Sequence, residues 1–327
     1  MKTRKFGKSG PEVSEVGLGT WQFGGDWGEV TEPQAFETMK AAVDSGVDFF
    51  DTADVYGAGR SEALIGKFLK ETKAKVFVAT KIIRFPEPGG TANFTWESFA
   101  KHTEGSLGRL GVDSLDLTQL HCPPTSELQK GDMFVWLRKL KAQGKIKRFG
   151  VSVESMDQAL LCLQQEGVES LQIIFNLFRQ KPIDVLFDKA KEKGVALIIR
   201  LPLASGLLAG KYKRDTQFAP QDHRTYNRDG QAFNVGETFA GIPFEKGVEL
   251  ADQIKTMVPK GMTLAQMANR WCLDFDAVTT LIPGGKNAAQ VIENAKASAL
   301  SPLSEKMHLD MRGFYNALVK RHIRGVY

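Results

Sequence analysis

Polar side chains follow directly on a short apolar run that has the character of a buried strand. Residues 49–62, FFDTADVYGAGRSE, begin with two phenylalanines, and Asp51, Asp54 and Tyr56 come next. A carboxylate is almost never fully buried unless it is paired. An acid at the exit of a strand, with a tyrosine just beyond it, therefore needs a partner and is a candidate for acid–base chemistry.

Lys81 and His121 complete a set of groups able to protonate a carbonyl oxygen. Lys81 ends the run KVFVATK, and His121 ends the run SLDLTQLH. A free phenol has a pKa of about 10, but a nearby ammonium stabilises the phenolate and lowers that pKa, while a carboxylate keeps the ammonium protonated and oriented. A histidine hydrogen-bonded to the same oxygen orients the carbonyl. The set predicts the proton half of a carbonyl reduction, with Tyr56 as the donor; the hydride must come from a cofactor.

Short β-rich runs alternate with segments of helical periodicity along the whole chain. Runs of Val, Ile and Leu between helices favour a parallel sheet covered by helices, and eight such runs predict an α/β fold of the (β/α)₈ TIM barrel type. The expected strands are 15–20, 47–53, 75–81, 114–121, 146–152, 170–176, 195–201 and 277–284. A doubly wound sheet would require G-x-G-x-x-G after the first strand, whereas Gln22 stands where the third glycine belongs.

The barrel prediction places the active site at the carboxyl ends of the strands. Asp51, Lys81, His121, Ser152, Asn176 and Arg200 all lie at or near the ends of expected strands. Other segments lie outside the alternation, within what we expect to be a single domain over 1–327. They are an N-terminal β-hairpin (4–16), two long loops (84–95 and 212–243), an extra helix among 244–257 and 263–275, and a C-terminal helix beginning within 303–327.

Composition and charge are those of an ordinary globular protein. The 327 residues are 42% apolar and 25% charged, and the net charge of +5 is spread without a basic block, which speaks against nucleic-acid binding. We find no signal peptide, and the longest apolar run, 195–210, is too short and too interrupted to span a membrane. The three cysteines have neither disulfide nor zinc spacing, so we expect a cytoplasmic protein without a metal. A self-contained barrel also favours a monomer acting on a small-molecule carbonyl or alcohol.

The motifs, in their order along the chain, resemble those of the aldo-keto reductases, such as the bacterial NADPH-dependent members. GLGTW (17–21) is similar to the first strand of that family, DTADVYG (51–57) to its catalytic Asp and Tyr, VATK to its lysine strand and LDLTQLHCPP to its histidine strand. KIKRFGVS, PLASGLLAGKY and IPGGKNAAQVIENAKA resemble its cofactor-binding segments. The resemblance implies NADPH-dependent reduction of an aldehyde or ketone to an alcohol. It makes Tyr56 the proton donor, tuned by Lys81 and Asp51, with His121 orienting the carbonyl.

The resemblance also implies that NADPH binds extended across the carboxyl ends of the strands. The implied cofactor-binding residues are Gly19, Thr20, Trp21, Ser152, Gln172, Arg200, Leu203, Ser205, Gly206, Leu207, Gly210, Lys211, Pro283, Gly284, Gly285, Lys286, Gln290, Glu293 and Asn294. Ser152 and Gln172 would hold the nicotinamide carboxamide, and Lys286 would face the 2′-phosphate. GGKN also precedes a helical pattern, and glycine-rich turns at helix N-termini bind phosphate through free backbone amides. Because Lys286 stands where relatives often carry arginine, we expect NADPH preference with some NADH use.

Two positions depart from the family pattern. Val153 follows Ser152 where the family usually has an asparagine, so a hydrogen bond of about 1 kcal/mol is missing or replaced. Arg200 stands where many relatives place an aromatic ring that stacks on the nicotinamide. A planar guanidinium can stack too, and its charge would disfavour the oxidised, positively charged nicotinamide.

Several alternatives stay open at the level of the sequence. A non-catalytic NADPH-sensing module on the same fold is the main rival, although it has little need of all four catalytic residues. A Schiff-base aldolase would need a neutral Lys81, which Asp51 opposes, and a metal hydrolase would need paired ligands that the histidines do not offer. Trp21 and Trp27 either line the substrate pocket or pack in the core. Residues 219–230 either close over the ligand or form a surface loop.

Overall fold

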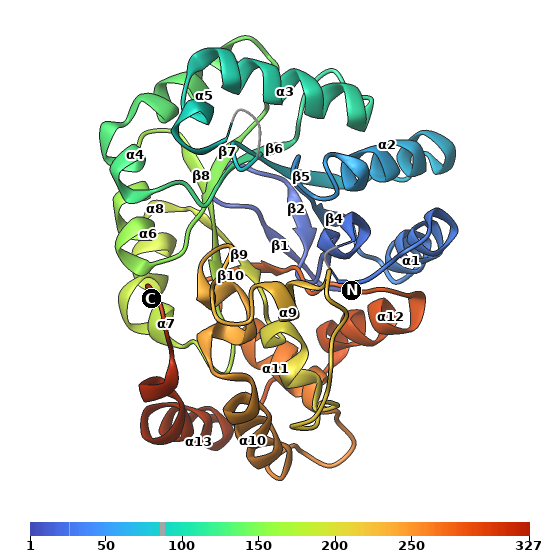
Figure 1. The fold of residues 1–327 in the computed structure, drawn as a ribbon, viewed down its shortest axis with the longest axis vertical. Coiled ribbons are helices and arrows are strands. Elements are labelled where there is room, and N and C mark those ends of the chain that lie inside the picture. Colours follow the sequence, from blue (N-terminus) through green and yellow to red (C-terminus); the bar gives the residue numbers. More distant parts are fainter. Residues whose placement is uncertain (26, 86–88) are drawn as a thin grey trace.

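Eight parallel strands form a barrel in the computed structural model, which describes residues 1–25, 27–85 and 89–327. Each strand is hydrogen-bonded to the next one along the chain (Figure 1). The strands are β3 (Leu18–Gly19), β4 (Phe49–Asp51), β5 (Phe77–Ile82), β6 (Leu117–His121), β7 (Phe149–Ser152), β8 (Val168–Ile174), β9 (Ala196–Arg200) and β10 (Val278–Leu281). Each overlaps the range expected from the sequence, so the (β/α)₈ prediction is confirmed.

The first and last strands meet and close the sheet. Isolated parallel bridges pair Val16 with Leu281 and Gly19 with Gly284. A Cβ at Gly19 would come within 2.7 Å of the Ile282 carbonyl oxygen, so a glycine is needed for this close approach. The seam brings the segments that follow β3 and β10 together at the carboxyl end of the barrel.

Helices lie outside the strands and cover them (Figure 1). They are α1 (Glu32–Asp44), α2 (Arg60–Thr72), α3 (Trp96–Leu110), α4 (Thr125–Lys130), α5 (Asp132–Ala142), α6 (Met156–Cys162), α7 (Lys181–Val185), α8 (Phe187–Lys193), α9 (His223–Tyr226), α10 (Phe244–Lys255), α11 (Leu264–Leu273), α12 (Ala288–Ala295) and α13 (Glu305–Phe314). Both α10 and α11 precede β10, as the expected extra helix requires. Within the described ranges, we find no helix with the length and apolar character needed to cross a membrane.

The N-terminal hairpin closes the amino-terminal end of the barrel. Its strands, β1 (Thr3–Lys5) and β2 (Glu12–Ser14), pair antiparallel. Phe6 follows β1 and is 1% exposed, and its ring centroid lies 5.1 Å from that of Phe77 and 6.1 Å from that of Phe49. These rings belong to a compact apolar cluster inside the barrel.

The alternation of side chains along the strands places the polar groups. Successive residues of a strand point to opposite faces, so residues two apart share a face. In β5, Ala79 belongs to the inner apolar cluster, and Lys81 therefore points inward one layer higher. In β9, Ile198 belongs to that cluster, and Arg200 follows it in the same way. The barrel interior thus changes from apolar to polar toward the carboxyl ends of the strands.

Residues 212–243 fold against this carboxyl end. They contain α9 and two 3₁₀ turns, Val235–Glu237 and Phe239–Gly241. Phe239 is fully buried, and its amide donates to Ser205 Oγ at 3.0 Å. The other long loop expected from the sequence, 84–95, includes residues 86–88, which lie outside the described residues.

Asn176 does not end a strand as the sequence analysis expected. β8 stops at Ile174, and Asn176 forms an antiparallel bridge with Arg179, which turns the chain back. Its side-chain amide donates to the Leu201 carbonyl at 2.8 Å, and its side-chain oxygen accepts from the Phe178 amide at 2.9 Å. These bonds give Asn176 a structural role at the barrel rim.

Candidate active site

Lys81 lies between a carboxylate and a phenol at the carboxyl end of the barrel. Its ammonium donates to Asp51 Oδ1 at 2.5 Å, to the Thr52 carbonyl at 2.8 Å and to the Tyr56 hydroxyl at 3.2 Å. Lys81 and Asp51 are 1% and 2% exposed. A buried ion pair is tolerated when further hydrogen bonds satisfy both partners, and the three donated bonds do this for Lys81.

The acids at the exit of β4 each have a partner. Asp51 Oδ2 accepts from Gln172 Nε2 at 2.7 Å and from Gln119 Nε2 at 3.2 Å. Asp54 lies 2.9 Å from His102 Nδ1, on α3. The two carboxylates therefore belong to different clusters, and only that of Asp51 reaches the phenol through Lys81.

Tyr56 is surrounded by rings. The His121 ring meets it edge-on, with centroids 5.9 Å apart and an interplanar angle of 84°. The Trp21 ring stacks on the Tyr56 ring, with centroids 5.9 Å apart and an interplanar angle of 18°. Trp27 in turn meets Trp21 edge-on at 5.6 Å. Trp21 and Trp27 therefore line the pocket around Tyr56, which is the first of the two alternatives.

Burial and neighbouring charges set the protonation of these groups. Burial lowers the pKa of Lys81, but Asp51 and Tyr56 outweigh it and the pKa is raised, so the ammonium is charged. Burial and nearby cations lower the pKa of His121 well below its ordinary value, so the imidazole is neutral near pH 7. Burial raises the pKa of Tyr56 by more than Lys81 lowers it. The sequence analysis expected Lys81 to lower this pKa on balance; burial reverses that outcome and keeps the phenol protonated.

A cavity of about 690 Å³ opens beside Tyr56 and His121. Its walls come from the segments after β3, β9 and β10 and from residues 212–243. The predicted site residues that line it are Gly19, Thr20, Trp21, Asp51, Tyr56, His121, Gln172, Arg200, Leu203, Ser205, Gly206, Lys211, Pro283, Gly284, Gly285, Lys286, Gln290, Glu293 and Asn294. Lys81 is not on the wall, because it lies behind Tyr56 and Asp51.

Three of the predicted cofactor-binding residues lie off the cavity wall. Leu207 is 1% exposed and packs toward α10, where a Cβ at Gly247 would come within 2.5 Å of its Cδ1. Gly210 ends a 3₁₀ turn with a positive φ of 67°. Ser152 is 1% exposed, and its Oγ lies 3.5 Å from Cys122 Sγ.

The far end of the cavity has features that suit a phosphate group. A Cβ at Gly284 would meet Gln22 Nε2 at 1.9 Å, and one at Gly285 would meet Val291 Cγ2 at 2.6 Å, so a side chain at either position would require these neighbours to move. The turn leads into α12, and Lys286 precedes that helix. Burial and the charge of Arg224 lower the pKa of Lys286, as expected for two cations that line the same end.

Residues 219–230 reach over the cavity through Arg224. Its guanidinium pairs with the Asp222 carboxylate at 2.5 Å and lies 4.7 Å from the centre of the Trp27 ring. Arg224 and Trp27 both line the cavity. Of the two alternatives for this segment, the structure shows that it contributes Arg224 to the cavity wall and is not a remote surface loop.

A comparison with protein families decides the kinship of the chain. The model of the aldo/keto reductase family matches residues 15–316. This protein is a member of the aldo-keto reductase family. An oxidoreductase is therefore its class of activity.

Individual relatives agree with this kinship. The chain is 29% identical to the aldo-keto reductase YhdN of Bacillus subtilis over 89% of this chain and 87% of that protein. It is 26% identical to a probable voltage-gated potassium channel subunit beta of Arabidopsis thaliana, over 95% of both chains. Among solved structures, it matches the glycerol dehydrogenase AKR11B4 of Gluconobacter oxydans with a TM-score of 0.78 and 27% identity, covering 99% of this chain and 98% of that one.

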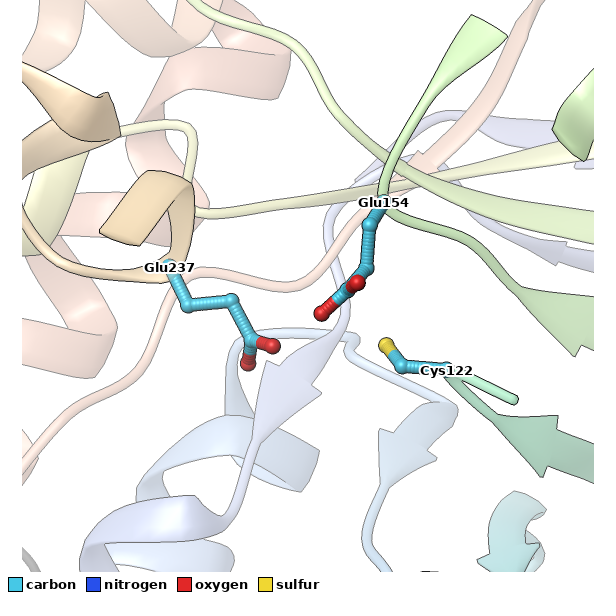
Figure 2. Close-up of side chains that lie close together, drawn as sticks. All are labelled: Cys122, Glu154 and Glu237. Atoms are coloured by element: carbon cyan, nitrogen blue, oxygen red, sulfur yellow. The ribbon is translucent and has the colours of Figure 1, made fainter. Parts of the chain in front are cut away.

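A charged cluster lies on the cavity wall beside Tyr56 and His121 in this aldo-keto reductase. Figure 2 shows Cys122, Glu154 and Glu237 pointing toward one another from the loops after β6 and β7 and from the segment 212–243, and their ligand atoms lie within 4.8 Å of one another. Arg84 Nη2 lies 3.0 Å from Glu237 Oε1, and Arg200 Nη1 lies 3.3 Å from Glu237 Oε2. Because two guanidiniums already pair with Glu237, we interpret the group as an ion-pair cluster and not as a metal site.

The two departures from the family pattern belong to this cluster. The Val153 side chain is 1% exposed and packs in the outer core, while its carbonyl accepts from Arg200 Nη2 at 3.1 Å. Cys122 is half-buried, with Sγ 3.5 Å from Arg200 Nη2, and burial raises the pKa of its thiol. Cys122 therefore lies against a charged side chain and not only against apolar neighbours.

Sequence reasoning missed several polar residues of the site, among them Gln119, Arg224 and Glu237. Gln119 lies two positions before His121, and strand alternation could have placed it inside the barrel. Arg224 and Glu237 come from the long segment 212–243, whose path no periodicity indicates. Their charge was visible, but their position depends on how the segment folds over the barrel.

Proposed function

We propose that this aldo-keto reductase uses NADPH to reduce an aldehyde or ketone to an alcohol, with Tyr56 as the proton donor. The observation that carries the proposal is the placement of the Lys81 ammonium between Asp51 Oδ1 and the Tyr56 hydroxyl, directly behind the cavity wall. A Schiff-base role for Lys81 is disfavoured, because the raised pKa keeps its nitrogen protonated.

The side chains have distinct roles in this proposal. When bound, NADPH supplies the hydride that reaches the carbonyl carbon. The Tyr56 hydroxyl donates its proton to the carbonyl oxygen, and the Lys81 ammonium stabilises the phenolate that remains. Asp51 keeps Lys81 charged and in place. Neutral His121 beside Tyr56 orients the carbonyl through a hydrogen bond to the same oxygen.

The residues that line the cavity suit nicotinamide adenine dinucleotide phosphate. The two glycines before α12 leave room for a backbone approach, and Lys286 and Arg224 offer positive charge at the same end of the cavity. Gln172, whose Nε2 is held by Asp51, lines the cavity near Tyr56 and can offer its amide oxygen to a carboxamide. The cavity of about 690 Å³ is within the size range of cofactor sites.

The test is to follow NADPH oxidation by the purified protein with an activated aromatic aldehyde, for the wild type and for Tyr56→Phe. We expect turnover in the wild type and a fall in kcat of roughly 100-fold or more in the variant, because the proton donor is lost. Tyr315→Phe, at a buried tyrosine that follows α13 and does not line the cavity, is the matched control and should retain turnover. Equal activity of Tyr56→Phe and wild type would contradict the assignment of the donor.

The similarity to a potassium channel subunit beta favours one second candidate, a module that binds NADPH as a signal without turning it over. The four catalytic residues weigh against it, because a pure sensor has little need of a tuned proton donor. The same assay separates the two functions: tight NADPH binding without turnover of any aldehyde or ketone would favour the sensor.

A further inference from the structure

Arg200 is held in one position beside the reacting end of the cavity. It is the last residue of β9, is 8% exposed and lines the cavity together with His121 and Gln172. Its guanidinium donates to the Val153 carbonyl at 3.1 Å and pairs with Glu237 at 3.3 Å. The Arg200 guanidinium, which the sequence analysis expected beside the nicotinamide, is therefore not an isolated cation.

Glu237 connects three parts of the site. Its carboxylate accepts from Arg84 Nη1 at 3.2 Å and pairs with Arg200, and its backbone carbonyl accepts from Ser205 Oγ at 3.4 Å. It is 4% exposed. Burial raises its pKa, but Arg84 and Arg200 outweigh burial and bring the pKa to about 2, so the side chain is a carboxylate at neutral pH.

Two cations and two acids surround this part of the cavity. Arg84 and Arg200 are cations and Glu237 is an anion. Burial and the neighbouring Glu237 carboxylate raise the pKa of Glu154. Removing the Glu237 carboxylate would make the cluster more positive by one charge, and removing the Arg200 guanidinium would make it more negative by one charge.

We infer that Glu237 is a positioning residue that holds Arg200 beside the nicotinamide and offsets its charge, and that it thereby sets the relative affinity of the enzyme for oxidised and reduced cofactor. The inference rests on the proposed function. Oxidised nicotinamide carries a positive charge and reduced nicotinamide is neutral. The charge of the cluster therefore acts on NADP⁺ and much less on NADPH, whereas the contacts that merely shape the cavity act on both.

The experiment measures the dissociation constants of NADP⁺ and NADPH at equilibrium, by calorimetry or fluorescence, for the wild type and Glu237→Gln. Removing the Glu237 carboxylate, which pairs with Arg200 on the cavity wall, should raise the ratio Kd(NADP⁺)/Kd(NADPH) by on the order of tenfold. Arg200→Met should lower that ratio. The double variant Arg200→Met/Glu237→Gln, which loses one positive and one negative charge, should return close to the wild-type ratio.

The outcomes separate the inference from the proposed function. Equal weakening of both forms in Glu237→Gln would make Glu237 a structural anchor only and would overturn the inference. Failure of the wild type to bind either form would overturn the proposed cofactor and the inference with it. If Glu237→Gln does not fold, Arg84→Met, in a partly exposed side chain of the same cluster, should lower the ratio; an unchanged ratio would overturn the inference.

Discussion

The protonation of Tyr56 and His121 determines how the reduction should depend on pH. Tyr56 must be protonated to donate, and its raised pKa delays the loss of that proton to pH values above those of an ordinary phenol. His121 has a pKa well below 6.5, so its neutral form persists as the pH falls through that value. We therefore expect kcat/KM for reduction to be flat between about pH 6 and pH 9.

A pH–rate profile of the wild type and His121→Gln checks this expectation. A decrease in kcat/KM around pH 6.5 that disappears in His121→Gln would mean that the histidine titrates in the working range. That result would contradict the buried, cation-surrounded environment that keeps the imidazole neutral.

Gln119 is a second residue whose role can be measured. Its amide donates to Asp51 at 3.2 Å, and its oxygen accepts from Gln172 Nε2 at 3.3 Å. Gln119→Leu keeps a similar volume but removes one of the two bonds that orient the Gln172 amide, while the bond to Asp51 remains. One lost hydrogen bond of about 1 kcal/mol corresponds to a roughly fivefold rise in the Kd of NADPH.

The control for this prediction is Gln180→Leu. Gln180 is also fully buried, but it bonds to the Leu177 and Met311 carbonyls. It should lower thermal stability and leave the Kd of NADPH unchanged. An equal rise in Kd for the two variants would assign the effect of Gln119→Leu to general loosening of the fold.

At the scale of elements, the turn before α12 should decide between the two nicotinamide cofactors. Lys286 precedes the helix and lines the cavity. Lys286→Met should raise the Kd of NADPH at least about tenfold and leave that of NADH nearly unchanged, since only NADPH carries a 2′-phosphate. Binding titrations of both cofactors measure this.

Lys296→Met is the matched control, because Lys296 follows α12 and pairs with Glu293 in an exposed position. Lys296→Met should leave the ratio of the Kd values of NADPH and NADH unchanged. If Lys286→Met weakened NADPH and NADH equally, Lys286 would contact a group that both cofactors share.

At the scale of elements, the sequence predicts the strands of the barrel but not the path of the long loop after β9. The eight strands were predictable because β-rich runs recur between helices, and alternation then places Lys81 and Arg200 inside the barrel. The path of residues 212–243 was not predictable, because it depends on contacts made across the barrel, such as the bond from the Phe239 amide to Ser205 Oγ. Arg224 and Glu237 were missed for that reason.

The pKa of Tyr56 illustrates the same limit for chemistry. The sequence indicates which charges surround the phenol, and Lys81 does lower its pKa. The sequence does not give the depth of burial, which raises the pKa by more. Residue types therefore predicted the reaction class, whereas the direction of this shift required the three-dimensional environment.

For the whole molecule, the hairpin and the site lie at opposite ends of the barrel, so stability and chemistry should be separable. Phe6 fills the amino-terminal end against Phe49 and Phe77. Phe6→Ala should lower the free energy of unfolding by about 3–5 kcal/mol, through lost burial and a residual cavity. Denaturant unfolding measures this, and kcat below the transition should stay near that of the wild type.

Val135→Ala serves as the control, since Val135 is 54% exposed and should change the stability little. A large fall in kcat of folded Phe6→Ala would show that the hairpin end and the catalytic end are coupled. That coupling would contradict the layered interior, in which an apolar cluster separates the hairpin from the polar groups.

The central claim is that hydride passes from the cofactor to a carbonyl carbon in the cavity beside Tyr56. The most direct measurement is to incubate the enzyme with an aldehyde and NADPH that carries deuterium on the reactive face of its nicotinamide, and to analyse the alcohol by mass spectrometry and NMR. The account predicts one deuterium on the carbinol carbon of the product. Alcohol without deuterium from either labelled face, or tight binding of the cofactor with no alcohol from any aldehyde or ketone, would contradict it.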